Sequence, residues 1–114
     1  MKLAIVGSRS FNDISLMEES IAKAFKVEDI TEVISGGAGG ADTLAEVWAE
    51  RHNIPTKIFH AKWGEKGRAA GYARNAEMIK VADACIAFWD GSKGTASSIS
   101  LCERYKVPCT VIKF

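Results

Sequence analysis

Five short apolar runs alternate with helical segments along the chain, and this alternation constrains the fold more than any other feature of the sequence. The runs lie at Lys2–Val6, Glu32–Ser35, Lys57–Phe59, Ala84–Trp89 and Thr110–Lys113. They show no regular polar alternation, which is typical of strands that helices cover on both faces. A strict succession of strand and helix predicts a parallel sheet with right-handed crossovers.

Helical periodicity fills the intervals between the strands. Ile14, Met17 and Ile21 share one stripe of the first helix, and Ser15 with Glu18 forms a candidate capping box. We expect the other helices at Ala41–His52, Gly71–Val81 and Thr95–Tyr105, the last with Thr95 as its N-cap. The sequence therefore predicts one α/β domain over residues 1–114, with three α/β/α layers and a five-stranded parallel sheet ordered 3-2-1-4-5.

Length and charge exclude several classes of protein. The chain has 114 residues, with 15 Lys and Arg against 14 Asp and Glu, a formal charge of +1. Such a balance argues against a nucleic-acid partner held by bulk counterion release. The longest apolar run, Ala84–Trp89, is far shorter than the roughly 20 residues of a membrane span, and no secretory signal stands near the start. We expect a cytoplasmic protein with no membrane contact.

The cysteines and histidines match no metal motif. Cys85, Cys102 and Cys109 are odd in number, contain no CxxC pair and lie in apolar segments, where free thiols pack as small hydrophobic groups. His52 and His60 are isolated and lack the spacing of zinc ligands. We therefore expect no disulfide framework, no metal and no cofactor.

Glycines mark one edge of the predicted sheet. All ten, at positions 7, 36, 37, 39, 40, 64, 67, 71, 91 and 94, fall in connections that lead from a strand into a helix. These connections gather at the carboxyl edge of a parallel sheet, where open α/β sheets bind ligands. Glycine-rich turns and helix N-termini present backbone N–H groups to anions such as phosphate. The sequence thus predicts a phosphate-bearing ligand at this edge.

The turn after the second strand is the strongest of these elements. It holds four glycines in five residues, Gly36, Gly37, Gly39 and Gly40, interrupted by Ala38. It departs from GxGxxG because Asp42 stands where the last glycine would be. Two interpretations stay open for the turn, a close-packed bend or a phosphate cradle. Asp42 is either a helix residue favoured by the dipole or an acceptor for a ribose hydroxyl.

Other connections supply further candidate side chains. Arg9 can offer a forked donor to phosphate, or is a surface or salt-bridged arginine. The cationic connection 61–71 has the length of a lid, and Phe11, Trp63 and Tyr72 are candidates for stacking on a base. The predicted ligand-binding residues are Gly7, Ser8, Arg9, Gly36, Gly37, Ala38, Gly39, Gly40, Asp42, Arg74, Asn75, Asp90, Gly91, Ser92, Gly94 and Thr95. Spacing alone indicates no catalytic constellation, so catalytic residues stay unassigned.

These pieces resemble the SLOG superfamily, a Rossmann-like group that includes DprA and the LONELY GUY phosphoribohydrolases, and within it the small YspA-like branch. The matching segments are Gly7-Ser8-Arg9 with Phe11 and Asp13, Gly36-Gly37-Ala38 with Gly40-Ala41-Asp42, Trp48-Ala49, Ala61 with Trp63, Ala70-Gly71 with Arg74-Asn75 and Met78, and Gly94-Thr95. The resemblance implies a nucleotide-derived ligand, such as ADP-ribose or an NAD-derived molecule, and a homodimer or larger homo-oligomer.

One departure from this group bears on catalysis. LONELY GUY enzymes carry a PGGxGTxxE motif whose glutamate assists N-glycosidic cleavage, and Ser98 stands at that position here. A serine cannot act as a carboxylate acid or base near neutral pH. The main interpretation is therefore a sensor or sequestering protein. The alternatives are an enzyme acting on a nucleotide N-glycosidic bond through Asp42, Glu77 or Asp90, and a DprA-like contact with nucleic acid.

Overall fold

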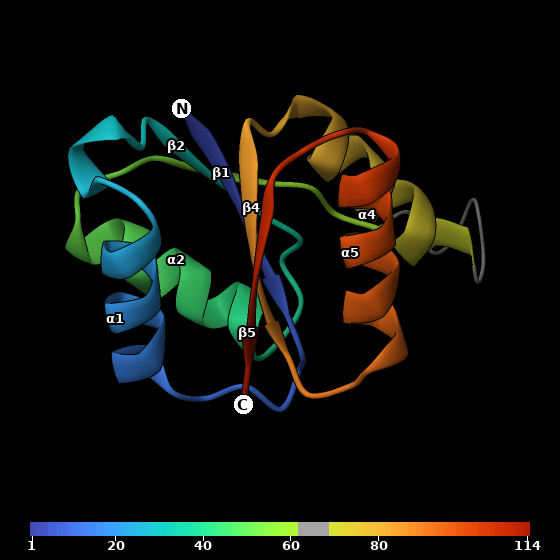
Figure 1. The fold of residues 1–114 in the computed structure, drawn as a ribbon, viewed down its shortest axis with the longest axis horizontal. Coiled ribbons are helices and arrows are strands. Elements are labelled where there is room, and N and C mark those ends of the chain that lie inside the picture. The colour runs from blue at the N-terminus through green and yellow to red at the C-terminus, as the bar shows by residue number, and fades with distance from the viewer. Residues whose placement is uncertain (62–68) are drawn as a thin grey trace.

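The computed structural model describes residues 1–61 and 69–114 and is built on one parallel sheet (Figure 1). Its strands are β1 (Lys2–Gly7), β2 (Glu32–Ser35), β3 (Thr56–Ile58), β4 (Ala84–Trp89) and β5 (Cys109–Lys113). They lie in the order β3-β2-β1-β4-β5, and every neighbouring pair is parallel. The predicted fold class and strand order are confirmed.

Helices cover both faces of the sheet. They are α1 (Ile14–Ala24), α2 (Ala41–Arg51), α4 (Ala70–Val81) and α5 (Lys93–Arg104), with a short 3-10 turn η1 (Val27–Asp29). In Figure 1, α1 and α2 pack on one side of the sheet and α4 and α5 on the other. No helix in the described part of the chain is both long and apolar enough to cross a bilayer.

The central strands explain why the runs are apolar throughout. Leu3 and Ile5 of β1 belong to a core with α1 and α2 that includes Trp48. Ala4 and Val6 belong to a second core, beneath α4 and α5. Every side chain of this part of β1 is therefore buried. The edge strands β3 and β5 are only half covered, so the expectation of burial on both faces is wrong for them.

Two predicted helix starts are wrong by a few residues. Asp13 caps α1, because its carboxylate accepts the Leu16 N–H at 3.0 Å, so Ser15 lies inside the helix and forms no capping box. Similarly, Ser92 is the N-cap of α5, and Thr95 lies in its first turn, where it accepts a hydrogen bond from the Ser92 hydroxyl at 3.2 Å. In both cases a polar residue two or three positions earlier ends the preceding loop.

Candidate functional site

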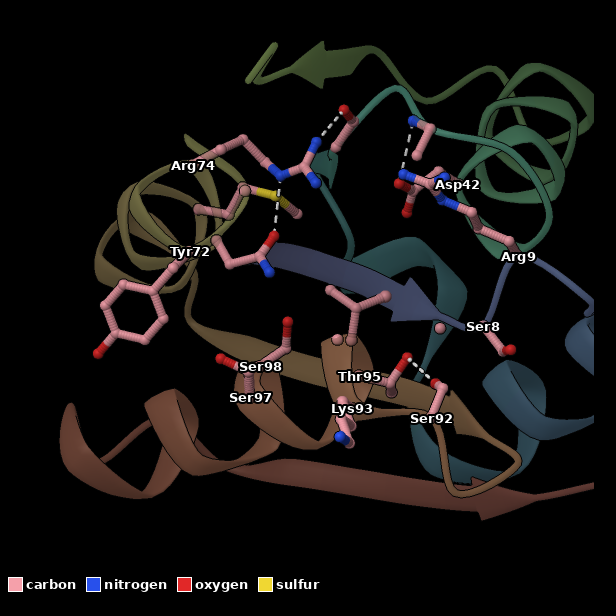
Figure 2. A pocket seen from close by; sticks show the side chains of 18 residues that line it. Ser8, Arg9, Asp42, Tyr72, Arg74, Ser92, Lys93, Thr95, Ser97 and Ser98 are labelled. Carbon is pink, nitrogen blue, oxygen red and sulfur yellow. Dashed lines mark hydrogen bonds between the residues drawn. The ribbon is translucent and has the colours of Figure 1, made fainter. Parts of the chain in front are cut away.

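A cavity of about 580 Å³ opens at the carboxyl edge of the sheet (Figure 2). It lies between the end of β1, the loop after β2 and the N-terminal turns of α4 and α5. Its volume lies within the usual range of small-molecule sites, roughly 300–1,000 Å³. Most of the predicted ligand-binding residues line it: Gly7, Ser8, Arg9, Gly36, Ala38, Asp42, Arg74, Asn75, Ser92, Gly94 and Thr95.

The remaining predicted residues lie elsewhere. Gly37 lines a smaller cavity of about 260 Å³ together with His60, and Arg9 and Arg74 line both cavities, so the two adjoin. The others line neither cavity: Gly39, Gly40, Asp90 and Gly91. The structure therefore does not place these four residues at the wall of either cavity.

The loop after β2 is braced from within. The Asp42 carboxylate accepts the Ala38 N–H at 3.1 Å, and the Thr43 hydroxyl donates to the Ala38 carbonyl at 3.2 Å. Gly40 has a φ of +63°, and a Cβ there would collide with the backbone of Arg9. Gly40 is therefore required where the loops after β1 and β2 cross, as the close-packed interpretation of the turn expects.

Gly36 also lies close to neighbouring side chains, whereas Gly39 does not. A Cβ on Gly36 would lie 2.8 Å from Nη1 of Arg74 and 3.0 Å from Oδ2 of Asp42. A Cβ on Gly39 would meet no atom within 4 Å. Packing thus accounts for most of this glycine cluster and leaves Gly39 unexplained.

Asp42 is a helix residue, as one of its two interpretations expects, and it also lies at the large cavity. It lies in the first turn of α2, is buried, and lines the large cavity. Burial raises the pKa of its carboxyl above the usual value, and this outweighs the opposing effects of the Ala38 hydrogen bond and the Arg74 charge.

Arg74 joins α4 to the loop after β2 (Figure 2). Its Nη1 donates to the Gly36 carbonyl at 2.6 Å, and its Nε donates to Oδ1 of Asn75 at 2.8 Å. These bonds use two of the five N–H donors of a guanidinium. Arg74 therefore positions the loop, and its charge also faces both cavities.

Arg9 differs from Arg74 in having no such bonds. It is exposed, lines both cavities, and makes no side-chain hydrogen bond or ion pair with the residues that the structure describes. With Arg74 and Lys93 it places three cationic side chains around the large cavity. Asp42 is the one carboxylate among the described lining residues. The cavity is therefore suited to an anion.

Asp90 ties two loops together outside the cavity. Its carboxylate accepts hydrogen bonds from the hydroxyls of Ser8 at 2.9 Å and Ser10 at 2.8 Å, and from the Ser92 N–H at 3.1 Å. The bonds from Ser10 and then Ser8 lower the pKa of Asp90. It is thus an ionised bridge between the loops after β1 and β4, and its lowered pKa does not suit a general acid.

The start of α5 forms one wall of the cavity. Gly94, Ser97 and Ser98 have the i, i+3, i+4 spacing of a helix face, Lys93 lies four residues before Ser97, and all four line the cavity. Sequence reasoning missed Lys93 and Ser97, although this spacing was the signal that could have found them. It also missed Val6, Gly71 and Met78, which are lining residues without a polar side chain.

The three aromatic residues predicted to stack on a base lie in different parts of the structure. Tyr72 lines the cavity and is 50% exposed, so its ring is available to a ligand. Phe11 is buried and stacks on Phe88 with ring centroids 4.6 Å apart, so the expectation that it stacks on a base is wrong. Trp63 lies outside the described residues, as does most of the proposed lid.

The parallel order, the paired loops and the ligand-sized cleft at their switch point define a Rossmann-like α/β/α protein. Residues 1–65 match the family described as the YspA, cpYpsA-related SLOG family, and the chain belongs to this family. The Gene 61 protein of Mycobacterium phage D29 is 33% identical over 121 residues, an alignment that covers 99% of this chain and 95% of that protein.

A solved structure corrects one expectation. DNA processing protein A from Helicobacter pylori, described for its single-stranded DNA binding mode, superposes with a TM-score of 0.73 and 22% identity. The alignment covers 97% of this chain, which spans 64% of that protein's chain. The expectation that nucleic acid is an unlikely partner was wrong to rest on net charge, because a protein of this fold binds single-stranded DNA. Net charge does not show how charges are placed on a surface, and here Arg9, Arg74 and Lys93 line one cavity.

Proposed function

We propose that the large cavity binds a nucleotide-derived ligand such as ADP-ribose or an NAD-like molecule, and that the protein acts as a sensor or sequestering protein. The observation that carries the proposal is the cavity of about 580 Å³ at the carboxyl edge, surrounded by Arg9, Arg74 and Lys93. A nucleotide diphosphate has the charge and size that such a cavity accommodates.

The phosphates are expected at the α5 side of the cavity. The first turn of a helix has N–H groups without intrahelical acceptors and carries the positive end of the dipole. Gly94 in this turn presents no side chain, and nothing lies within 4 Å of where its Cβ would be. The backbone is therefore open to a close approach by phosphate oxygens, and Arg9 can add a forked, charge-assisted donor.

The nucleoside is expected on the α4 side. The half-exposed ring of Tyr72 offers a stacking surface, and Asp42 offers an acceptor for a ribose hydroxyl. Ser98, in the place that the resemblance gives to a catalytic glutamate, is buried at the cavity wall. We therefore expect the protein to hold its ligand and to cleave nucleoside monophosphates only slowly.

Titration calorimetry with ADP-ribose, NAD and the free bases tests this proposal. We expect the nucleotides to bind and the bases not to. Arg9→Ala removes a charge-assisted bond and should weaken binding by roughly 10–150-fold, corresponding to about 1.5–3 kcal/mol. Its thermal midpoint should stay near wild type. Arg51→Ala, at the exposed C-terminal end of α2, is the matched control and should bind like wild type.

Two results would contradict the proposal. One is folded, ligand-free protein that binds none of these nucleotides. The other is unchanged affinity in Arg9→Ala, which would remove the arginine from the site. Fast release of base from a nucleoside monophosphate, lost on Asp42→Asn, would favour the enzyme interpretation instead.

The similarity to DNA processing protein A favours a second candidate, contact with single-stranded nucleic acid. Its phosphates would follow the same cations, Arg9, Arg74 and Lys93. Fluorescence anisotropy with a labelled oligonucleotide at several salt concentrations tests this candidate, because phosphate contacts weaken as salt rises. Salt-dependent binding that Arg9→Ala reduces and that ADP-ribose does not displace would support nucleic acid over a free nucleotide.

A further inference from the structure

The three cysteines meet at the amino edge of the sheet, at the end away from the large cavity. Cys85 on β4 and Cys109 on β5 are direct neighbours in the strand register, and Cys102 lies on α5 above them. Their three sulfur atoms all lie within 4.8 Å of one another. Cys85 and Cys102 are buried, and Cys109 is half-buried. The free thiols pack in the apolar core beneath α4 and α5, as the sequence predicts, and strand register and the crossover also bring the three together.

We propose that Cys85, Cys102 and Cys109 form a three-thiolate site for one soft monovalent metal ion, Cu(I). This inference does not depend on the proposed nucleotide function, since the two sites lie at opposite edges of the sheet.

The geometry of the sulfur atoms is close to that of a three-coordinate site. With metal–sulfur bonds of about 2.3 Å, as in zinc thiolates, a trigonal ion holds its sulfurs roughly 4 Å apart. The largest separation here is within 4.8 Å, so side-chain shifts of less than about 1 Å close the site around an ion. Backbone movement is not needed.

The donor set favours a soft ion of low coordination number. Among the described residues the cluster contains three thiols and no histidine or carboxylate. Its surroundings are apolar and include Ala4, Ile79 and Leu101. Zinc in structural sites takes four protein ligands, whereas thiolates select Cu(I) by their softness. A site with three sulfur ligands and apolar surroundings therefore suits Cu(I) better than zinc.

Binding exchanges thiol protons for the metal ion. Each coordinating thiol loses its S–H proton to solvent, three S–Cu bonds form, and no oxidation state changes.

Anaerobic titration of the reduced protein with Cu(I), in competition with a coloured Cu(I) chelator, tests the site. We expect one ion per chain and an ultraviolet thiolate-to-copper band. X-ray absorption at the copper edge should count three sulfur neighbours. The absence of one-to-one binding in the folded wild type would overturn the proposal, as would a count of two sulfurs.

Cysteine variants provide a second test of the site. Cys109→Ser and Cys102→Ala should each weaken Cu(I) binding at least tenfold. Ser20→Ala replaces a buried residue of α1 on the opposite face of the sheet and should bind Cu(I) as the wild type does. Wild-type affinity in a folded cysteine variant would overturn the three-sulfur site. If a variant does not fold, the wild-type protein is tested by alkylation instead. One equivalent of Cu(I) should protect its thiols, and full alkylation would count against the site.

Two further outcomes separate other chemistries. Tighter binding of Zn(II) than of Cu(I) would overturn the three-coordinate assignment, because it requires a fourth ligand. A disulfide that forms in air, seen as a loss of two hydrogen masses, together with no Cu(I) binding after reduction, would make the cluster a redox pair and not a metal site. Weak Zn(II) binding beside tight Cu(I) binding is the expected pattern.

Discussion

The loops after β2 and β4 are both rich in glycine and both adjoin the large cavity, but the structure uses their glycines differently. In the loop after β2, Gly36 and Gly40 avoid collisions with Arg74 and with the backbone of Arg9. After β4, Gly91 in the loop has a φ of +95° but no close neighbour, and Gly94 in the first turn of α5 faces open space and has no unusual φ. Glycine content alone therefore does not distinguish a packed crossing from a surface open to a ligand.

The two acidic residues of these loops differ in the same way. Asp42 is buried, and burial raises its pKa, whereas Asp90 is exposed, and hydrogen bonds from Ser10 and Ser8 lower its pKa. Asp42 lines the cavity and Asp90 does not. The Asp42 carboxylate thus braces the loop after β2 but loses solvation through its burial. The Asp90 carboxylate holds the loop after β4 and stays charged.

The largest effect is expected at the crossing of the loops. Gly40→Ala forces a side chain onto a left-handed backbone and into the Arg9 backbone. The strain and overpacking should lower the free energy of unfolding by about 2–4 kcal/mol. Urea denaturation of the purified variant measures this change.

Gly39→Ala is the matched control within the same loop. Its Cβ meets no atom within 4 Å, so its unfolding free energy should stay within about 0.5 kcal/mol of wild type. Equal losses in the two variants would contradict the distinction between required and open glycines.

The second effect separates the two arginines of the cavity. Arg74→Ala removes hydrogen bonds to the Gly36 carbonyl and to Asn75, and we expect it to cost about 1.5–3 kcal/mol of stability. Arg9→Ala breaks no bond with the described residues and should change stability by less than about 0.5 kcal/mol. Denaturant melts of both variants check this. Equal melts would mean that the Arg74 bonds contribute little to holding the loop.

Sequence patterns predicted the sheet and its order because both depend on long-range regularities. Apolar runs and their alternation with helices leave few topologies for a parallel sheet. The starts of α1 and α5 were misplaced because each depends on a local competition between polar residues, Asp13 with Ser15 and Ser92 with Thr95. Pattern alone does not decide which of two nearby side chains caps a helix.

The cavity and the cysteine cluster also differ in how far the sequence predicts them. The cavity residues were predictable because every strand-to-helix loop of a parallel sheet ends at one edge. The cysteine cluster was not, since Cys85, Cys102 and Cys109 come together only through the register of β4 with β5 and the packing of α5. The spacing of the three cysteines along the sequence does not predict that they lie together in the fold.

The third prediction uses the opposite pKa shifts of the two carboxylates. The pKa of Asp42 in the folded state lies above 3.8, so its contribution to stability falls as pH rises through that range. The pKa of Asp90 lies below 3.8, so its contribution is present at neutral pH and is lost in acid. Relative to wild type, Asp42→Asn should gain stability and Asp90→Asn should lose stability as pH rises from about 3 to 7.

Urea melts of both variants and the wild type at several pH values check these slopes. Each difference should level off once the carboxylate is ionised in both the folded and the unfolded chain, and for Asp42 this happens at a higher pH because its pKa is raised. Slopes of the same sign for the two variants would contradict the assignment of one buried and one hydrogen-bonded carboxylate.

The prediction that most sharpens the comparison, with no loss of stability, concerns Gly94. Because its Cβ would meet no atom and the residue lies in a helix, Gly94→Ala should leave stability unchanged or raise it by up to about 1 kcal/mol. The new methyl group would project where the proposed phosphate approaches the first turn of α5, so ADP-ribose affinity should fall at least about fivefold, or ~1 kcal/mol. Calorimetry and melts on the same preparation measure both quantities. A more stable protein that binds less ligand identifies Gly94 as a residue kept small for the ligand, whereas unchanged affinity would place the phosphates away from α5.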